Sequence, residues 1–471
     1  YAVAAGYDGG VAGGTQDNGT QYMNLDGNNL LEAVEILGGD GGTTEISKIK
    51  PNFIFASFMD FGAESSVIRR SVNGGNTSAS MYDCNIDKQG GGSGDPCDPD
   101  GAPDQGAQFV SPFKLWENYD RYLDFEGALK GDSSEYPVGS GNWYWQGDVV
   151  PNYEGQGALE VTEANVIQAK LFAGHGSSSS AGQVWVTVAP LLSSTAGVPE
   201  WYKLTSNSFG FDVSALDYSK DGDILYVGTS NGRVFRFSGL NDADYAYNDF
   251  SHISSGDSVF TFNPDSAGIV TTELWNFGRF VTDVHVDKSD AGHVVVTLGG
   301  TGGNNVWRST DADGGANFNN ISGQLPNQIT YDGLINLYNS DQILVAAEFG
   351  VWSYDASSPG DGWSQEVDGI GNVPVFELRQ ELYGGRDCYG LYIATHGRGF
   401  WYSSSLIPAS GFDHCPTVRT SIQDPIQEEI VAGISVYPNP TMDASTVALQ
   451  LNNRSIVNAV SYTHLRAHET S

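Results

Sequence analysis

The chain has 471 residues and a formal net charge of −35, from 57 acidic and 22 basic side chains. This charge excludes the basic surface that binding to a nucleic-acid backbone or to anionic lipid requires. Apolar residues make up 39% of the chain, too much for a disordered acidic protein, and 60 glycines and 18 prolines favour short strands joined by tight turns.

The N-terminus reads as the inside of a strand. Tyr1 is not preceded by Met, and no charged segment followed by an apolar one begins the chain. We therefore expect a truncated or processed N-terminus. No run approaches about 18 consecutive apolar residues, so we expect no membrane span.

One pattern recurs along the chain: an apolar strand ending in Gly or Thr, a glycine-rich turn, and a strand of alternating character. The seven copies are Val11–Asn24, Phe53–Gly75, Leu171–Val188, Ile224–Ser238, Val294–Gly315, Ile343–Asp355 and Leu391–Ser403. Four copies follow another strand-like run, namely Val213–Ser219, Val281–Asp287, Leu334–Asn339 and Val375–Gln380.

The spacing of these copies predicts the fold. A four-stranded propeller blade takes about 40–50 residues, and most copies follow one another at about that distance. The sequence therefore predicts an all-β chain with a β-propeller of about seven blades over residues 1–405, interrupted by insertions at 76–160 and 240–275. An array of β-sandwiches is the alternative, but it would not repeat one hairpin at blade spacing.

Several turns resemble those of a known group of secreted propellers. The segment Arg308–Phe318 (RSTDADGGANF) resembles an Asp-box, or BNR repeat, with extra residues and with Phe318 in place of Trp. Arg70–Gly75 (RSVNGG) resembles a degenerate copy with Asn73 in place of Asp. The turns TQDNGT, GGDGG and ATHGRGFW are similar to signatures of sortilin-like and xyloglucanase-like propellers, a resemblance that implies the fold.

The C-terminal region resembles a different domain. Ile434–Leu451 is similar to the start of a type A sorting domain of the type IX secretion system. This resemblance implies export through that machinery, with residues 434–451 as its contact, and a secreted or outer-surface location in a Gram-negative bacterium. We expect a linker at 406–430, a truncated β-sandwich-type sorting domain at 431–460, and a non-native tail at 461–471.

Two aspartates are candidates for catalysis. A propeller glycosidase needs two carboxyl groups facing its substrate. Asp17, in the TQDNG turn, is similar in position to a catalytic Asp of the xyloglucanase-like enzymes, and Asp40, in GGDGG, is a second turn Asp. The corresponding later turns offer only Glu348. The alternative is that both aspartates cap turns, a common role of Asp beside Gly.

An acidic loop that directly follows Cys97 is a candidate calcium site. Asp98, Asp100 and Asp104 surround Gly101, and alternate carboxylates on a glycine-turned loop suit a hard cation. The alternative is a solvated acidic loop. In an exported chain we expect Cys84 to pair with Cys97 and Cys388 with Cys415, whereas a cytosolic chain would keep four free thiols.

Aromatic residues in the long insertion are candidates for ligand binding. They are Trp116, Trp143, Tyr144 and Trp145. Such rings could stack on sugars or contact a protein, or they could pack in a small core of the insertion.

The sequence favours a secreted or cell-surface protein that binds extracellular glycans or proteins over an enzyme. A polysaccharide hydrolase of the xyloglucanase-like kind is the alternative, and a sortilin-like scaffold is a third possibility. The ligand and the oligomeric state are left open.

Overall fold

In the structure, a computed structural model, the chain divides into two compact units, 1–415 and 416–471. The described residues are 2–6, 9–24, 33–48, 50–60, 65–81, 110–118, 128–130, 135–137, 149–151, 158–160, 169–177, 180–191, 199–205, 211–245, 262–366, 370–382, 389–407, 431–437 and 446–451.

The first unit contains seven successive antiparallel sheets, which we number as blades from the N-terminus. Blade one has β1 (Ala4–Ala5), β2 (Gly10–Gly14), β3 (Thr20–Asn24) and β4 (Val34–Leu37). Blade two has β5 (Asp40–Ile46), β6 (Ile54–Asp60), β7 (Ser65–Ser71) and β8 (Ala79–Ser80). Blade three has β9 (Phe113–Glu117), β14 (Ala169–Ser177), β15 (Ser180–Thr187) and β16 (Tyr202–Lys203).

The remaining blades follow the same order. Blade four has β17 (Val213–Tyr218), β18 (Leu225–Thr229), β19 (Arg233–Ser238) and β20 (Val270–Asn276). Blade five has β21 (Val281–Asp287), β22 (Asp290–Leu298), β23 (Val306–Thr310) and β24 (Asn319–Asn320). Blade six has β25 (Thr330–Ile335), β26 (Gln342–Ala347), β27 (Gly350–Asp355), the short 3-10 turn η2 (Pro359–Asp361) and β28 (Trp363–Glu366). Blade seven has β29 (Val375–Leu382), β30 (Tyr389–Thr395) and β31 (Phe400–Ser403).

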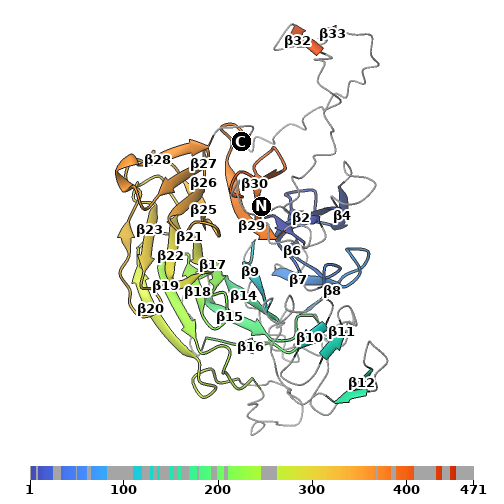
Figure 1. Cartoon of the computed structure of the whole chain (residues 1–471), viewed down its shortest axis with the longest axis vertical. Coiled ribbons are helices and arrows are strands. Elements are labelled where there is room, and N and C mark those ends of the chain that lie inside the picture. Colours follow the sequence, from blue (N-terminus) through green and yellow to red (C-terminus); the bar gives the residue numbers. More distant parts are fainter. Residues whose placement is uncertain are drawn as a thin grey trace. The chain divides into compact units, whose positions relative to one another are not determined.

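These sheets form a seven-bladed β-propeller (Figure 1). All seven predicted hairpins form the second and third strands of a blade, so the predicted fold is confirmed. The four predicted upstream runs are the innermost strands β17, β21, β25 and β29. The only displaced one is β25, which begins at Thr330 rather than at Leu334.

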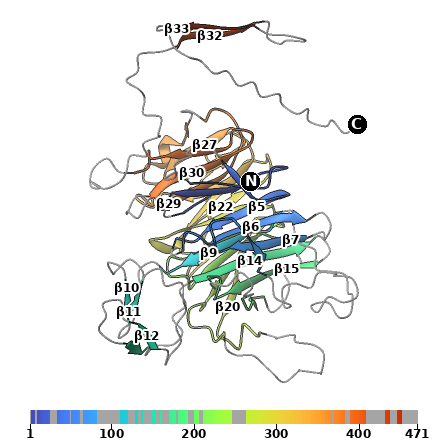
Figure 2. The same ribbon diagram turned by 90° about the vertical axis from the view of Figure 1, so that its right-hand side faces the viewer.

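The ring closes where the last blade meets the first. The innermost strand β29 lies beside β1 and the N-terminal sheets, as Figures 1 and 2 both show. The backbone N–H of Val3 donates to Glu377 Oε2 on β29 at 2.7 Å. Closure therefore uses contacts between sheets rather than a strand exchanged between the chain ends, as far as the described residues extend.

The insertion expected at 76–160 is not a single segment. It contains β8 and also β9, the innermost strand of blade three, which pairs with β14 although their sequence positions lie far apart. Two short strand pairs follow β9: β10 (Ala128–Lys130) with β11 (Glu135–Pro137), and β12 (Val149–Pro151) with β13 (Ala158–Glu160). The second expected insertion, 240–275, lies mainly between β19 and β20 and includes most of β20.

The core lies between neighbouring blades. One buried cluster joins Tyr226 and Val234 of blade four to Val284 and Val296 of blade five. Valine-rich strands that are buried on both faces explain why these segments read as continuous apolar runs. An equivalent Trp on the third strand of blades five, six and seven donates its indole N–H to the carbonyl three residues earlier, in the pairs Trp307–Asn304, Trp352–Phe349 and Trp401–Arg398.

The second unit contains one described strand pair, β32 (Val431–Tyr437) with β33 (Thr446–Leu451). This hairpin falls within the segment that resembles a sorting domain. Among the described residues of the whole chain, no helix is long and apolar enough to cross a membrane.

Candidate functional site

The two predicted catalytic aspartates lie together at one end of blades one and two. Asp17 is exposed in the β2–β3 turn, and its backbone N–H donates to Asp40 Oδ1 at 2.6 Å. Asp40 is 7% exposed and begins β5. One carboxylate of the pair therefore caps the turn that carries the other, the role that we gave as the alternative to catalysis.

Trp116 is in the core and is not part of an exposed binding surface. Its side chain is 4% exposed, and its indole N–H donates to the Lys220 carbonyl at 2.9 Å. The ammonium group of Lys170 lies 4.8 Å from the ring centroid. The prediction of a ligand-binding role for Trp116 is therefore wrong, because β9 is a strand of a blade and not part of an insertion.

The buried ammonium group of Lys170 should make the stability of the protein depend on pH in the alkaline range. Burial lowers its pKa to about 8, more than Asp223 and Asp221 raise it. Between that pKa and the unfolded value near 10.5, the unfolded chain holds more protons, so the free energy of unfolding rises with pH, by roughly 3 kcal/mol. Denaturant titrations from pH 7 to 10.5 should show this rise, and Lys170→Met should remove it. An unchanged slope in the variant would contradict the assignment.

The other predicted site residues lie outside the described residues. They are Trp143, Tyr144, Trp145, Asp98, Asp100, Asp104, Cys84, Cys97, Cys388 and Cys415. Within the described part of the chain, no group of three or more His, Cys, Asp or Glu side chains could hold a metal ion.

Exposed aromatic side chains gather at one end of the blades, which we call the loop end. Since strand direction alternates, the turns between second and third strands and the connections to the next blade lie at this end. Phe211 precedes β17, Phe280 precedes β21, and Phe349 lies in the β26–β27 turn, with exposed fractions of 44%, 47% and 52%. Three consecutive blades, four to six, therefore each present an exposed ring at the loop end.

An aromatic and polar group continues this surface onto blade seven. Phe376 meets the Tyr331 ring edge-on at 4.9 Å and the exposed His396 at 5.6 Å between centroids. The Tyr331 hydroxyl donates to Glu348 Oε2 at 2.5 Å. Burial and this carboxylate raise the pKa of Tyr331, so the phenol stays protonated as a donor.

Arg279, next to Phe280, holds the β22–β23 turn by hydrogen bonds. Its guanidinium donates to the carbonyls of Gly299 and Gly303 and to Asn305 Oδ1, at 2.5, 2.6 and 2.8 Å. These bonds tie the glycine-rich β22–β23 turn to Arg279, the residue directly before Phe280. The backbone that carries the Phe280 ring is therefore held in place by the turn.

The two segments that resemble Asp-boxes occupy equivalent turns between the third and fourth strands. In blade five, Ser309 Oγ donates to Asp311 Oδ1, and Asn317 donates to the same carboxylate. In blade two, Ser71 Oγ donates to Asn73 Oδ1, and the Thr77 N–H donates to that oxygen too. The hydrogen bonds from Asn317 and Ser309 lower the pKa of Asp311. Both turns therefore serve the blade structure.

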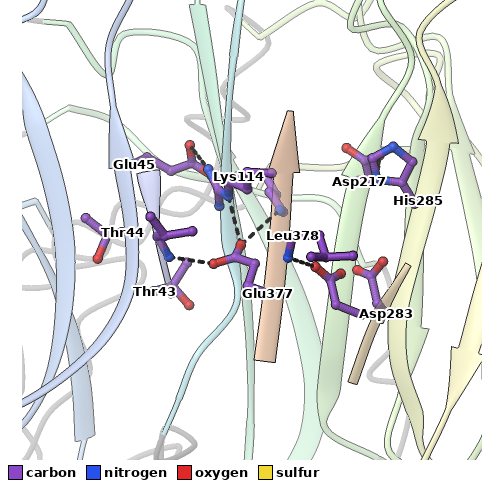
Figure 3. A network of polar contacts seen from close by, with 12 residues as sticks. Thr43, Thr44, Glu45, Lys114, Asp217, Asp283, His285, Glu377 and Leu378 are labelled. Atoms are coloured by element: carbon purple, nitrogen blue, oxygen red, sulfur yellow. Dashed lines mark hydrogen bonds and ion pairs between the residues drawn. The ribbon is translucent and has the colours of Figure 1, made fainter. Parts of the chain in front are cut away.

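Ionisable side chains from several innermost strands meet around the propeller axis (Figure 3). Arg379 on β29 donates two hydrogen bonds to Glu45 on β5, at 2.7 and 2.8 Å, and a third to Glu377 at 2.8 Å. Burial acts to raise the pKa of Glu377, but Arg379 and Lys114 outweigh it and lower that pKa. Arg379 therefore connects blade seven to blade two across the short β1.

Carboxylates at this axis join neighbouring blades by one repeated contact. On four successive innermost strands, a carboxylate oxygen accepts a backbone N–H from the innermost strand of the next blade or, in blade one, from the residue directly before that strand. The pairs are Asp217 with Val286 at 2.7 Å, Asp283 with Gly333 at 3.2 Å, Asp332 with Leu378 at 2.6 Å, and Glu377 with Val3 at 2.7 Å.

A shared irregularity positions three of these carboxylates. The pairing of the first two strands shifts register directly before Asp283, Asp332 and Glu377, in blades five, six and seven. Such bulges re-aim a side chain. Sequence reasoning missed these residues, although Thr-Asp, Tyr-Asp and Phe-Glu recur near the start of the three strands and could have indicated them.

Comparisons with known proteins give only distant structural likenesses. The chain matches no protein-family model, and no curated protein matches it. It is similar to Raptor of Chaetomium thermophilum (TM-score 0.44, 10% identity, 85% of this chain and 28% of that chain). It is also similar to the Cps50 (Swd1) β-propeller domain of Myceliophteria thermophila (0.42, 10%, 85% and 93%) and to an ancestral GH74 enzyme (0.47, 14%, 85% and 44%). Likenesses at this level carry no argument on activity.

Proposed function

We propose that the protein is an extracellular binding protein and that the loop end of blades four to seven contacts its ligand. The observation that carries this proposal is the exposure of Phe211, Phe280 and Phe349 at equivalent ends of consecutive blades. Exposed apolar groups gathered on one face mark interaction sites, and loops on a rigid scaffold commonly carry binding residues.

A glycan is the ligand class that this surface fits. Aromatic rings can stack on the apolar faces of sugars, while the side chains between them supply hydrogen bonds. His396 and Asn372 are exposed at the same end, and the Tyr331–Glu348 pair adds a fixed hydroxyl and carboxylate. The net charge of −35 favours neutral or cationic glycans over anionic ones.

A glycan array probed with the full chain, followed by calorimetry on the glycan bound most tightly, tests the proposal. We expect Phe280→Ala and Phe349→Ala each to weaken binding about fivefold, because one stacked ring contributes about 1 kcal/mol. Val270→Ala is the matched control, since Val270 is 57% exposed at the other end of blade four. Binding that survives both Phe substitutions, or no binding by the unaltered chain, would refute the proposal.

Hydrolysis of a polysaccharide is a second candidate function, favoured by the backbone of Asp17. This exposed residue has a φ of 60°, in the left-handed region that non-glycine residues rarely adopt and that recurs at active sites. Asp17→Asn should abolish any cleavage seen in the same screen. Cleavage that persists in the variant would remove Asp17 from the reaction.

We propose export by the type IX machinery through residues 434–451, calcium bound by Asp98, Asp100 and Asp104, and disulfides Cys84–Cys97 and Cys388–Cys415. The Asp-box assignment of the two Ser-Asp and Ser-Asn turns is proposed on their equivalent places in blades five and two.

A further inference from the structure

Two of the exposed rings belong to turns of neighbouring blades. Phe280 directly precedes β21 of blade five, and Phe349 lies in the β26–β27 turn of blade six. A surface that must order itself on binding loses affinity, because the ordering of side chains and loops costs free energy. The contacts that hold these two turns in place therefore affect how strongly the rings can bind.

A chain of hydrogen bonds joins the two turns. Arg279, beside Phe280, donates to Asn305 Oδ1 at 2.8 Å. Asn305 Nδ2 donates in turn to the backbone carbonyl of Gln328 at 2.6 Å. The side-chain oxygen of Gln328, Oε1, accepts the backbone N–H of Phe349 at 3.1 Å. Two side chains, Asn305 and Gln328, thus connect the residue beside one ring to the residue that carries the other.

Both connecting side chains are buried, with exposed fractions of 3% for Asn305 and 2% for Gln328. Asn305 Nδ2 also donates to the Gly300 carbonyl at 2.9 Å, so both polar atoms of this amide are paired. Gln328 Nε2 has no hydrogen-bond partner among the described residues. A buried donor without a partner is destabilising, and an apolar side chain of the same shape would avoid this cost. The amide of Gln328 is therefore explained by the hydrogen bond that its oxygen accepts from Phe349.

The turn that carries Phe349 is also held from the side of blade seven. Gln365 Nε2 donates to the Phe349 carbonyl at 2.7 Å and to Asn372 Oδ1 at 2.8 Å. The Gly350 N–H donates to the Val373 carbonyl at 3.0 Å. Both backbone polar groups of Phe349 are therefore used within the protein, and its exposed ring is the part that can meet a ligand.

Given the proposed binding function, on which this step rests, we propose that Asn305 and Gln328 are positioning residues that fix the Phe280 and Phe349 rings relative to each other, so that both meet the ligand as one preformed unit. The two amides are buried and do not touch the ligand themselves. Their loss should weaken binding although both rings are still present, because the turns must then be ordered when the ligand binds.

Amide hydrogen exchange of the full chain without ligand tests the connection between the turns. Gln328→Met removes the acceptor, so exchange at Phe349 should become about fivefold faster relative to Val345, a buried residue of β26. Gln328→Glu keeps an accepting oxygen and should restore the ratio of the unaltered chain. Asn305→Ala should also speed exchange at Phe349, by about twofold, although its bond is to Gln328 and not to Phe349.

Asn336→Ala is the matched control. Asn336 is 2% exposed, donates to Gln342 Oε1 at 2.6 Å and accepts from Gln380 Nε2 at 3.0 Å, but it follows β25 at the end opposite the loop end. We expect this variant to leave the ratio of exchange at Phe349 and Val345 unchanged, even where overall stability falls. An unchanged ratio in Gln328→Met, or the same change in Asn336→Ala as in Asn305→Ala, would overturn the proposal.

Calorimetry with chitohexaose and mannohexaose, as neutral glycan probes, tests the consequence for binding. For a probe that binds, Gln328→Met should weaken binding about threefold, and Gln328→Glu should restore it. The double variant Phe280→Ala with Phe349→Ala should weaken binding by less than the product of the two single effects. Unchanged binding in Gln328→Met, or single effects that simply multiply, would overturn the proposal. Failure of both probes to bind the unaltered chain would count against the proposed function, whereas the exchange rates decide on the connection between the turns without any ligand.

Discussion

Arg379→Met is expected to lower the free energy of unfolding by about 3–5 kcal/mol. The guanidinium is 6% exposed and bonded to Glu45 and Glu377, with Glu381 within 3.9 Å. Breaking a buried ion pair from one side leaves uncompensated charge, which costs more than the pair contributes. Here Glu45, Glu377 and Glu381 would lose the guanidinium that they share, while Lys114 stays beside Glu377 and Lys48 beside Glu381. Urea denaturation at pH 7 measures the change.

Two further variants separate charge from geometry. Arg379→Lys keeps the charge but loses the two parallel bonds to Glu45, so we expect an intermediate loss. Arg233→Met is the matched control, because the Arg233–Glu273 pair lies within blade four and both side chains are over one-third exposed. Its change should stay within about 0.5 kcal/mol. A loss below about 1 kcal/mol for Arg379→Met would show that closure does not depend on this contact.

A double-mutant cycle locates the interaction between blades two and seven. If Arg379 and Glu45 act as a unit, Arg379→Met combined with Glu45→Gln should cost less than the sum of the single changes. Additive losses would mean that Arg379 acts through Glu377 and Glu381 on its own strand instead.

The repeated hairpins were predictable because both strands of each hairpin are adjacent in sequence. The alternation of apolar and polar residues and the glycines of the turns were enough to find them, including hairpins as different as β2–β3 and β30–β31. The innermost strand of blade three was not predictable in this way. β9 pairs with β14 across a long segment, so its aromatic residues read as part of an insertion and Trp116 was assigned to a binding surface.

The axial network was harder to anticipate for a physical reason. Asp283, Asp332 and Glu377 acquire their common role only when three strands from different blades are brought side by side, and when a bulge turns each carboxylate toward the next strand. By contrast, Asp17 and Asp40 were found together because each sits beside turn glycines. The sequence then could not distinguish catalysis from turn capping, which depends on the hydrogen bond between them.

The second large effect is expected where blades one and two meet. A Cβ atom on Gly14 would lie 2.0 Å from the Gly42 carbonyl oxygen and 2.6 Å from the Gly41 carbonyl carbon. Both are backbone atoms, so no side-chain rotation relieves the clash. Gly14→Ala should therefore cost about 3 kcal/mol, at the upper end of overpacking effects, although alanine is otherwise better than glycine in a strand.

Gly314→Ala is the matched control for this substitution. Nothing lies within 4 Å of a Cβ at Gly314, and its φ is not in the left-handed region, so we expect no loss or a small gain of stability.

The close approach of Gly14 to Gly41 and Gly42 also affects the candidate site, because Gly14 directly precedes the turn that bears Asp17. If Gly14→Ala spreads the blades, the Asp17–Asp40 hydrogen bond should break with them, and amide exchange at Asp17 should accelerate. Unchanged exchange with full stability would mean that the two blades tolerate the added methyl group.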